Sequence, residues 1–141
     1  MSADEIWLRR PADSAPEDPG KRDLGRKPLI NLEKLQAWLS REEFDVEYDF
    51  WAASDGCWND LQTLQWRFAR VVQVIKSLHS SDYHRSMWCL TDGGWFACYA
   101  YRICFDEGRN ERRQGAVRFY LKFSLDDSGD LVLVLVSAHT G

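Results

Sequence analysis

Carboxylates crowd one stretch of the chain, residues 42–60, which contains no Lys or Arg. They are Glu42, Glu43, Asp45, Glu47, Asp49, Asp55 and Asp60. Carboxylates two residues apart on one strand face would stand about 7 Å apart, close to the phosphate spacing along one nucleic-acid strand. The run is typical of a solvated face, and it also fits a docking surface for a basic partner, either a nucleic-acid-binding protein or a cationic effector. The predicted partner-binding residues are Asp45, Glu47, Asp49, Trp51 and Asp55.

A second group of polar and aromatic side chains could line a pocket. Its members are Trp88, Trp95, Tyr99, Tyr101, Arg102 and Tyr120. Tyr99, Tyr101 and Arg102, together with Asp49, could act in acid–base chemistry on a small molecule, although packing or surface exposure explains each of them as simply. The sequence has no G-x-S-x-G, H-E-x-x-H, P-loop or dinucleotide fingerprint. We therefore assign no catalytic residue and no cofactor, and an enzyme is the less favoured class.

Metal binding is not predicted either. His79, Asp82 and His84 lie close together in the sequence, but loop spacing of this kind is unspecific, and no further ligand is dictated. The C-terminal end of a helix and a surface loop explain these residues equally well. The chain has no C-x-x-C pair, which argues against a zinc knuckle or a thioredoxin-like site. Its cysteines are Cys57, Cys89, Cys98 and Cys104.

The charge of the chain is uneven. Residues 1–60 hold 14 Asp and Glu against 8 Lys and Arg, whereas residues 61–141 hold 8 against 10, so the two parts carry −6 and +2. A net acidic chain argues against general nucleic-acid binding. No window has the roughly 20 apolar residues that span a membrane, and the first ten residues lack the pattern of a secretory signal. We therefore expect a cytoplasmic protein with no membrane contact.

The elements that would position these residues are arranged around one strand. Residues 95–105 are the densest strand-forming run, and both faces of that run are mostly apolar, so something must cover each side. A helix is one cover. The other could be a partner subunit, the N-terminal segment or a bound ligand.

Residues 1–28 contain all four prolines and are predicted to be a flexible tail. Alternatively, Ile6, Trp7 and Leu8 could dock on a sheet edge or on another protein. A single domain is then expected over residues 29–141. Its predicted elements are a helix at 31–41, a strand at 44–50, a long helix at 61–78, and strands at 87–91, 95–105, 116–125 and 131–136.

Two details of the strands bear on the site. The strand at 116–125 alternates, with Arg118, Tyr120, Lys122 and Ser124 on a wet face. The hairpin turn before the central strand can use Gly93-Gly94 or Asp92-Gly93 as its loop. We prefer the first, because it needs positive φ only at glycines. That register places Cys89 opposite Cys98, where a disulfide is conceivable, although two reduced thiols are favoured in a cytosolic chain.

The order of elements predicts an α+β fold, with helices packed on one face of a bent antiparallel meander. Over residues 31–138 this order resembles the cone-shaped cystatin-like and nuclear-transport-factor-like superfamily. The resemblance implies a cone that can serve as a binding pocket or an active site, and a convex sheet that often dimerises. It implies no catalytic residue in this chain, because it covers element order only.

Three functional hypotheses follow. The favoured one is a non-catalytic protein–protein interaction module, such as a small inhibitor, immunity factor or adaptor, that binds a basic protein through the acidic strand and the aromatic sheet. The second is a cone-pocket small-molecule binder or an enzyme with isomerase- or lyase-like acid–base chemistry. The third is a structural homodimer subunit.

Overall fold

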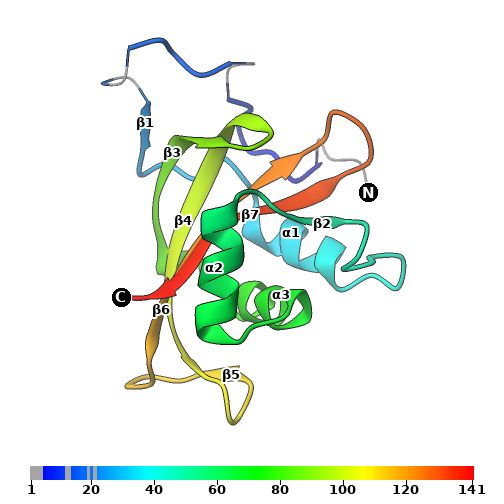
Figure 1. Ribbon diagram of the computed structural model, residues 1–141, viewed down its shortest axis with the longest axis vertical. Helices are drawn as coiled ribbons and strands as arrows, with labels where there is room; N and C mark the ends of the chain where they lie inside the picture. Colours follow the sequence, from blue (N-terminus) through cyan, green and yellow to red (C-terminus); the bar gives the residue numbers. More distant parts are fainter. Residues whose placement is uncertain (1–4, 12–13, 19, 21) are drawn as a thin grey trace.

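The computed structural model describes residues 5–11, 14–18, 20 and 22–141. It has an α+β fold, as the sequence predicts (Figure 1). The helices are α1 (Leu32–Leu39), α2 (Asp55–Leu64), α3 (Phe68–Lys76) and the 3₁₀ helix η3 (Ser80–Asp82). The strands are β1 (Asp23–Gly25), β2 (Phe50–Ala52), β3 (Tyr83–Thr91), β4 (Gly94–Asp106), β5 (Glu111–Arg112), β6 (Arg118–Asp126) and β7 (Val132–Thr140).

Strand β4 lies in the middle of the sheet, as expected for the run at 95–105. The strand order is β1-β3-β4-β6-β7-β2, and β5 pairs with β4 outside this path. All pairings are antiparallel except that of β2 with β7, which is parallel. Figure 1 shows α1, α2 and α3 on one side of the β3–β4–β6 part of the sheet. The meander and the one-sided helices are therefore confirmed.

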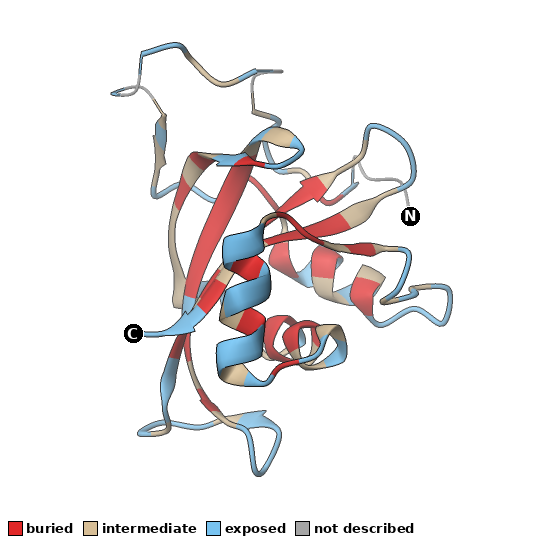
Figure 2. Ribbon diagram, in the orientation of Figure 1, coloured by how far each residue is buried: buried red, intermediate tan, exposed pale blue. Residues whose placement is uncertain are grey.

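The two faces of the sheet differ in their cover. The face toward the helices, here called the inner face, carries buried β4 side chains such as Tyr101 and Phe105. Trp66, just before α3, packs against Phe119 of β6 with 4.8 Å between ring centroids. On the opposite, outer face of β4, Arg102 is exposed. Figure 2 shows the buried residues gathered where the sheet meets the helices.

Part of the segment predicted to be a tail packs on the domain. Ile6 is fully buried, and Trp7 forms a β-bridge with Ile30. The Trp7 ring also meets Tyr99 edge-on at 6.2 Å, on the inner face. Strand β1, which the sequence did not indicate, pairs with β3. The N-terminal segment thus helps the helices cover the inner face, whereas the sequence suggested it as one possible cover for the opposite face.

The acidic strand predicted at 44–50 is wrong. Residues before Phe50 form turns, and only Phe50–Ala52 is a strand. Asp49 accepts a hydrogen bond from the backbone N–H of Asp45, and Asp45 accepts one from that of Glu47, each at 2.9 Å. These side chains satisfy backbone donors that a strand ladder would need, which is how Asp competes with regular structure.

The single long helix predicted at 61–78 is also wrong, because the chain breaks it into α2 and α3. Gln65 takes a left-handed conformation with φ 59°. Its N–H bonds to the carbonyl of Gln62, and the N–H of Trp66 bonds to that of Leu61. This is a Schellman motif, with buried Leu61 and Trp66 at the two positions that usually make its apolar contact. The motif turns α3 onto the sheet.

The preferred hairpin register is wrong as well, and the alternative with Asp92-Gly93 as the loop is observed. Thr91 pairs with Gly94, so Cys89 lies opposite Phe96. The Thr91 hydroxyl explains the choice, since it accepts from Gly93 N–H at 3.1 Å and donates to the Gly94 carbonyl at 2.9 Å. Gly94 takes the positive φ, at 104°.

Candidate functional site

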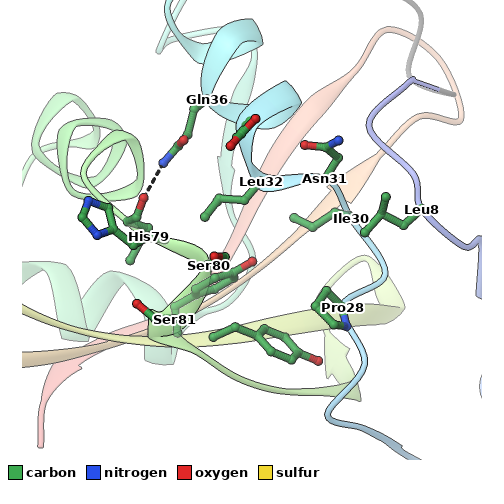
Figure 3. Close-up of a pocket in the computed structure, with 13 residues that line it drawn as sticks. Leu8, Pro28, Ile30, Asn31, Leu32, Gln36, His79, Ser80 and Ser81 are labelled. Carbon is green, nitrogen blue, oxygen red and sulfur yellow. Dashed lines mark hydrogen bonds between the residues drawn. The ribbon is translucent and has the colours of Figure 1, made fainter.

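A groove lies between α1, η3, the inner face of the sheet and the N-terminal segment (Figure 3). Its volume is about 690 Å³. Buried Ile30, Leu32, Leu78 and Tyr101 contribute its apolar lining, and exposed His79 lies on its rim. A groove of this kind can hold a small, mostly apolar molecule.

The polar groups of the groove are partly committed to the fold. The Gln36 amide donates to the carbonyls of Leu78 at 2.8 Å and Ile75 at 3.0 Å, which joins α1 to the end of α3 (Figure 3). The Tyr83 hydroxyl lies 2.7 Å from Ser86 Oγ. Burial raises the pKa of Tyr101, so its hydroxyl stays protonated and can donate a hydrogen bond. In the part of the chain that is described, no group of three metal-binding side chains comes together.

The six residues predicted for a pocket do not share one. Tyr101 lines the groove, whereas Tyr99 is fully buried in the core. Trp88 and Trp95 line a smaller hollow of about 260 Å³. Arg102 and Tyr120 are cross-strand partners on the outer face. Neighbouring residues of a strand point to opposite faces, so the run 99–102 is divided between two sides of the sheet.

The acidic residues form a loop, residues 42–49, which we call the acidic loop. Glu42, Glu43, Asp45 and Glu47 are exposed, and Tyr48 is 77% exposed. None of these carboxylates forms an ion pair with any described residue. The loop therefore presents negative charge without ion-pair partners together with an exposed aromatic ring.

Two residues predicted for the same surface lie elsewhere. Trp51 of β2 packs edge-on against Phe96 with 6.2 Å between centroids, beside the β3–β4 turn. Asp55 is the first residue of α2 and directly follows the N-cap residue Ser54. Half-exposed Trp58 lies 5.4 Å from Phe68, which stacks on Phe50 directly after the acidic loop. Sequence periodicity did not indicate this aromatic contact, because it joins two separate helices.

A cationic and aromatic cluster lies on the outer face of the sheet, and we call it the outer-face cluster. Arg102, Tyr120 and His139 are direct partners across three strands. Tyr120 stacks on His139 with centroids 5.1 Å apart and planes at 21°. Arg118 and Lys122 flank Tyr120 on β6. The alternation at 116–125 predicted a wet face here, but Ser124, predicted to lie on it, is buried and donates a hydrogen bond to the Ala97 carbonyl. The partners on β4 and β7 follow only from the register.

His84 completes the outer-face cluster. A nitrogen of the Arg102 guanidinium lies 3.0 Å from His84 Nε2, and the ring lies 6.4 Å from Tyr120. Partial burial lowers the pKa of His84, and the cations Arg102, Arg85 and Arg26 lower it further. The imidazole is therefore neutral at pH 7, with Nε2 as an acceptor for Arg102.

Comparison of the chain with protein-family models, with curated proteins and with solved structures finds no match. The cystatin-like or nuclear-transport-factor-like architecture is therefore not confirmed, although the α+β class is. Within the described residues, no helix is long and apolar enough to cross a bilayer.

Proposed function

We propose that this protein is a non-catalytic interaction module that binds a cationic protein through the acidic loop. The observation that carries the proposal is a set of exposed carboxylates without ion-pair partners on the same short loop as the exposed ring of Tyr48. Glu43, Asp45 and Glu47 would attract the partner, and the ring would fill a pocket on it.

The local structure of the loop supports this role. The bonds from the backbone of Asp45 and Glu47 to the side chains of Asp49 and Asp45 hold the turns, and the carbonyl of Asp49 accepts from Leu133 N–H at 2.7 Å. The loop is thereby anchored to β7. A surface that is ordered before binding loses less conformational entropy on association.

We further propose that the protein is cytoplasmic. All four cysteines are free thiols, and Cys57 and Cys98 are buried. Free thiols are typical of a reducing compartment.

The test is a comparative capture experiment with a lysine-rich peptide and with native lysate. A variant carrying Glu43→Lys, Glu47→Lys and Tyr48→Ala should lose the peptide and the proteins that the wild-type protein captures. A matched variant carrying Glu111→Lys and Asp130→Lys changes charge at two other exposed sites and should retain them. Equal capture by both variants would reject the acidic loop as the binding surface.

The groove supports a second candidate function, small-molecule binding. The favouring observation is an apolar lining that includes the buried, protonated Tyr101. In a thermal-shift screen, compounds that bind the groove should raise the Tm of the wild-type protein. They should not raise that of Leu32→Trp, in which the larger ring fills the groove. A compound that stabilises both proteins equally binds elsewhere.

A further inference from the structure

The outer-face cluster concentrates positive charge on a protein that is acidic overall. Arg102 and Arg118 line a hollow of about 360 Å³ together with Arg112 and Arg113. Asp82 binds Arg112 through both of its carboxylate oxygens, and Asp106 lies 3.3 Å from Arg113. Two guanidiniums of the hollow are thus neutralised by carboxylates.

The other cations of the hollow and of β6 have no Asp or Glu beside them. Among the described residues, no Asp or Glu side chain lies within ion-pair distance of Arg102, Arg118 or Lys122. Arg118 Nε donates to the main-chain oxygen of Gly141 at 2.9 Å, and Arg102 contacts the uncharged His84. Like charges gathered on one face repel one another, so an anion placed among them is stabilised.

The spacing of the cluster fits a chain of phosphates and bases. Arg118, Tyr120 and Lys122 are successive outward residues of β6, each about 7 Å from the next. A ring therefore stands between two cations. Proteins bind single-stranded nucleic acids in this way, with cations along the sugar-phosphate backbone and aromatic rings on which the bases stack.

The rings favour a nucleic acid over an acidic peptide. The Tyr120 ring is stacked face to face on His139 and meets His84 near-perpendicularly, so three aromatic rings lie beside one another across the sheet. A base can stack on aromatic rings, whereas the carboxylate of an acidic peptide uses only the cations. Figure 1 shows the three helices on the other side of this part of the sheet, so they leave the outer face accessible.

We propose that the outer-face cluster binds single-stranded nucleic acid, with phosphates at Arg102, Arg118 and Lys122 and a base on Tyr120. This surface is separate from the acidic loop, and the inference does not depend on the proposed function. It qualifies the expectation, drawn from net charge, that direct nucleic-acid binding is unlikely. Net charge is summed over the whole chain, whereas a bound nucleic acid interacts mainly with the charges of the face that it contacts.

The test is fluorescence anisotropy of a labelled 12-nucleotide single strand at several salt concentrations. The wild-type protein should bind it. The double variant Arg102→Gln, Arg118→Gln should bind more weakly and with a salt slope smaller by about 1.4, since each phosphate contact on a single strand contributes about 0.7. The control variant Arg41→Gln, Arg67→Gln changes two exposed arginines beside the helices and should leave the slope unchanged.

Stacking is tested separately from charge. Tyr120→Leu keeps every cation and should weaken binding between about 5-fold and 150-fold, the loss expected for one stacked base. Melting curves confirm that each variant is folded. Failure of the wild-type protein to bind the oligonucleotide would overturn the proposal. The proposal would also be overturned if Tyr120→Leu left the affinity for the oligonucleotide unchanged and poly-glutamate bound with the same affinity. That result would identify a surface that binds anions in general.

Discussion

At the scale of single residues, two thiols on the outer face differ in reactivity because of their neighbours. Cys98 faces Met87 and Cys89 faces Phe96, so the two cysteines are diagonal neighbours on adjacent strands. The neighbouring Cys98 thiol and the nearby Lys122 ammonium lower the pKa of Cys89. The neighbouring Cys89 and burial raise the pKa of Cys98. Cys89 is therefore the nucleophilic thiol of the pair.

We predict that iodoacetamide alkylates Cys89 first, at a pH below that needed for an ordinary thiol. Lys122→Met removes a positive charge that stabilises the thiolate, so the midpoint of the pH–rate profile should rise. Mass spectrometry of the modified peptides measures both effects. Cys104 is the internal comparison, since it is also half-buried. Equal labelling of Cys89 and Cys104 at neutral pH would contradict the prediction.

At the scale of elements, the boundary between α2 and α3 decides how the helices meet the sheet. Gln65 holds a left-handed conformation that favours glycine, because a side chain there costs about 1 kcal/mol or more. The Schellman bonds at Leu61 and Gln62 offset this cost and place Trp66 on Phe119. The break in the helix therefore rests on hydrogen bonds as well as on the residue at the turn.

We predict that Gln65→Gly raises the free energy of unfolding by about 1 kcal/mol, because glycine adopts positive φ without strain. The matched change Gln62→Gly, inside α2, should lower it by about 1 kcal/mol. Urea denaturation of the three proteins measures both. If Gln65→Gly destabilises the protein as much as Gln62→Gly does, the left-handed turn is not a source of strain.

At the scale of the whole molecule, β2 closes one end of the sheet onto the β3–β4 turn. The N–H of Ala53 bonds to the carbonyl of Leu135 at 2.9 Å, and the carbonyl of Ala53 accepts from Asp92 N–H at 3.0 Å. The Trp51 ring lies against Gly93, where an added Cβ would stand only 2.6 Å from the ring. This contact joins a strand near residue 50 to a turn near residue 93.

We predict that Gly93→Ala destabilises the protein by about 1 to 3 kcal/mol, the usual cost of overpacking. In the double variant with Trp51→Ala the ring is absent, so the two losses should not add. Gly129→Ala is the control, since a Cβ there meets no atom within 4 Å. Thermal unfolding followed by circular dichroism gives the comparison. Full additivity would show that the ring and the turn are not in contact.

Part of the candidate site could be anticipated from local pattern. The alternation that places Arg118, Tyr120 and Lys122 together is visible in the sequence, because residues two apart on a strand share a face. The contributions of Arg102 and His139 could not be anticipated. They depend on the registers of β6 with β4 and with β7, which place Arg102 and His139 directly opposite Tyr120.

The sequence by itself determined the α+β class, the central strand near 95–105 and the exposure of the carboxylates at 42–47, since these follow from periodicity and from the cost of burying charge. Only the tertiary structure decided that Asp45 and Asp49 close a loop and that Gln65 ends a helix. It also decided that basic and aromatic side chains gather on one face of an acidic chain. The physical reason is common to all three. Each depends on hydrogen bonds or strand pairings chosen among near-equal local alternatives, and packing against distant residues makes that choice.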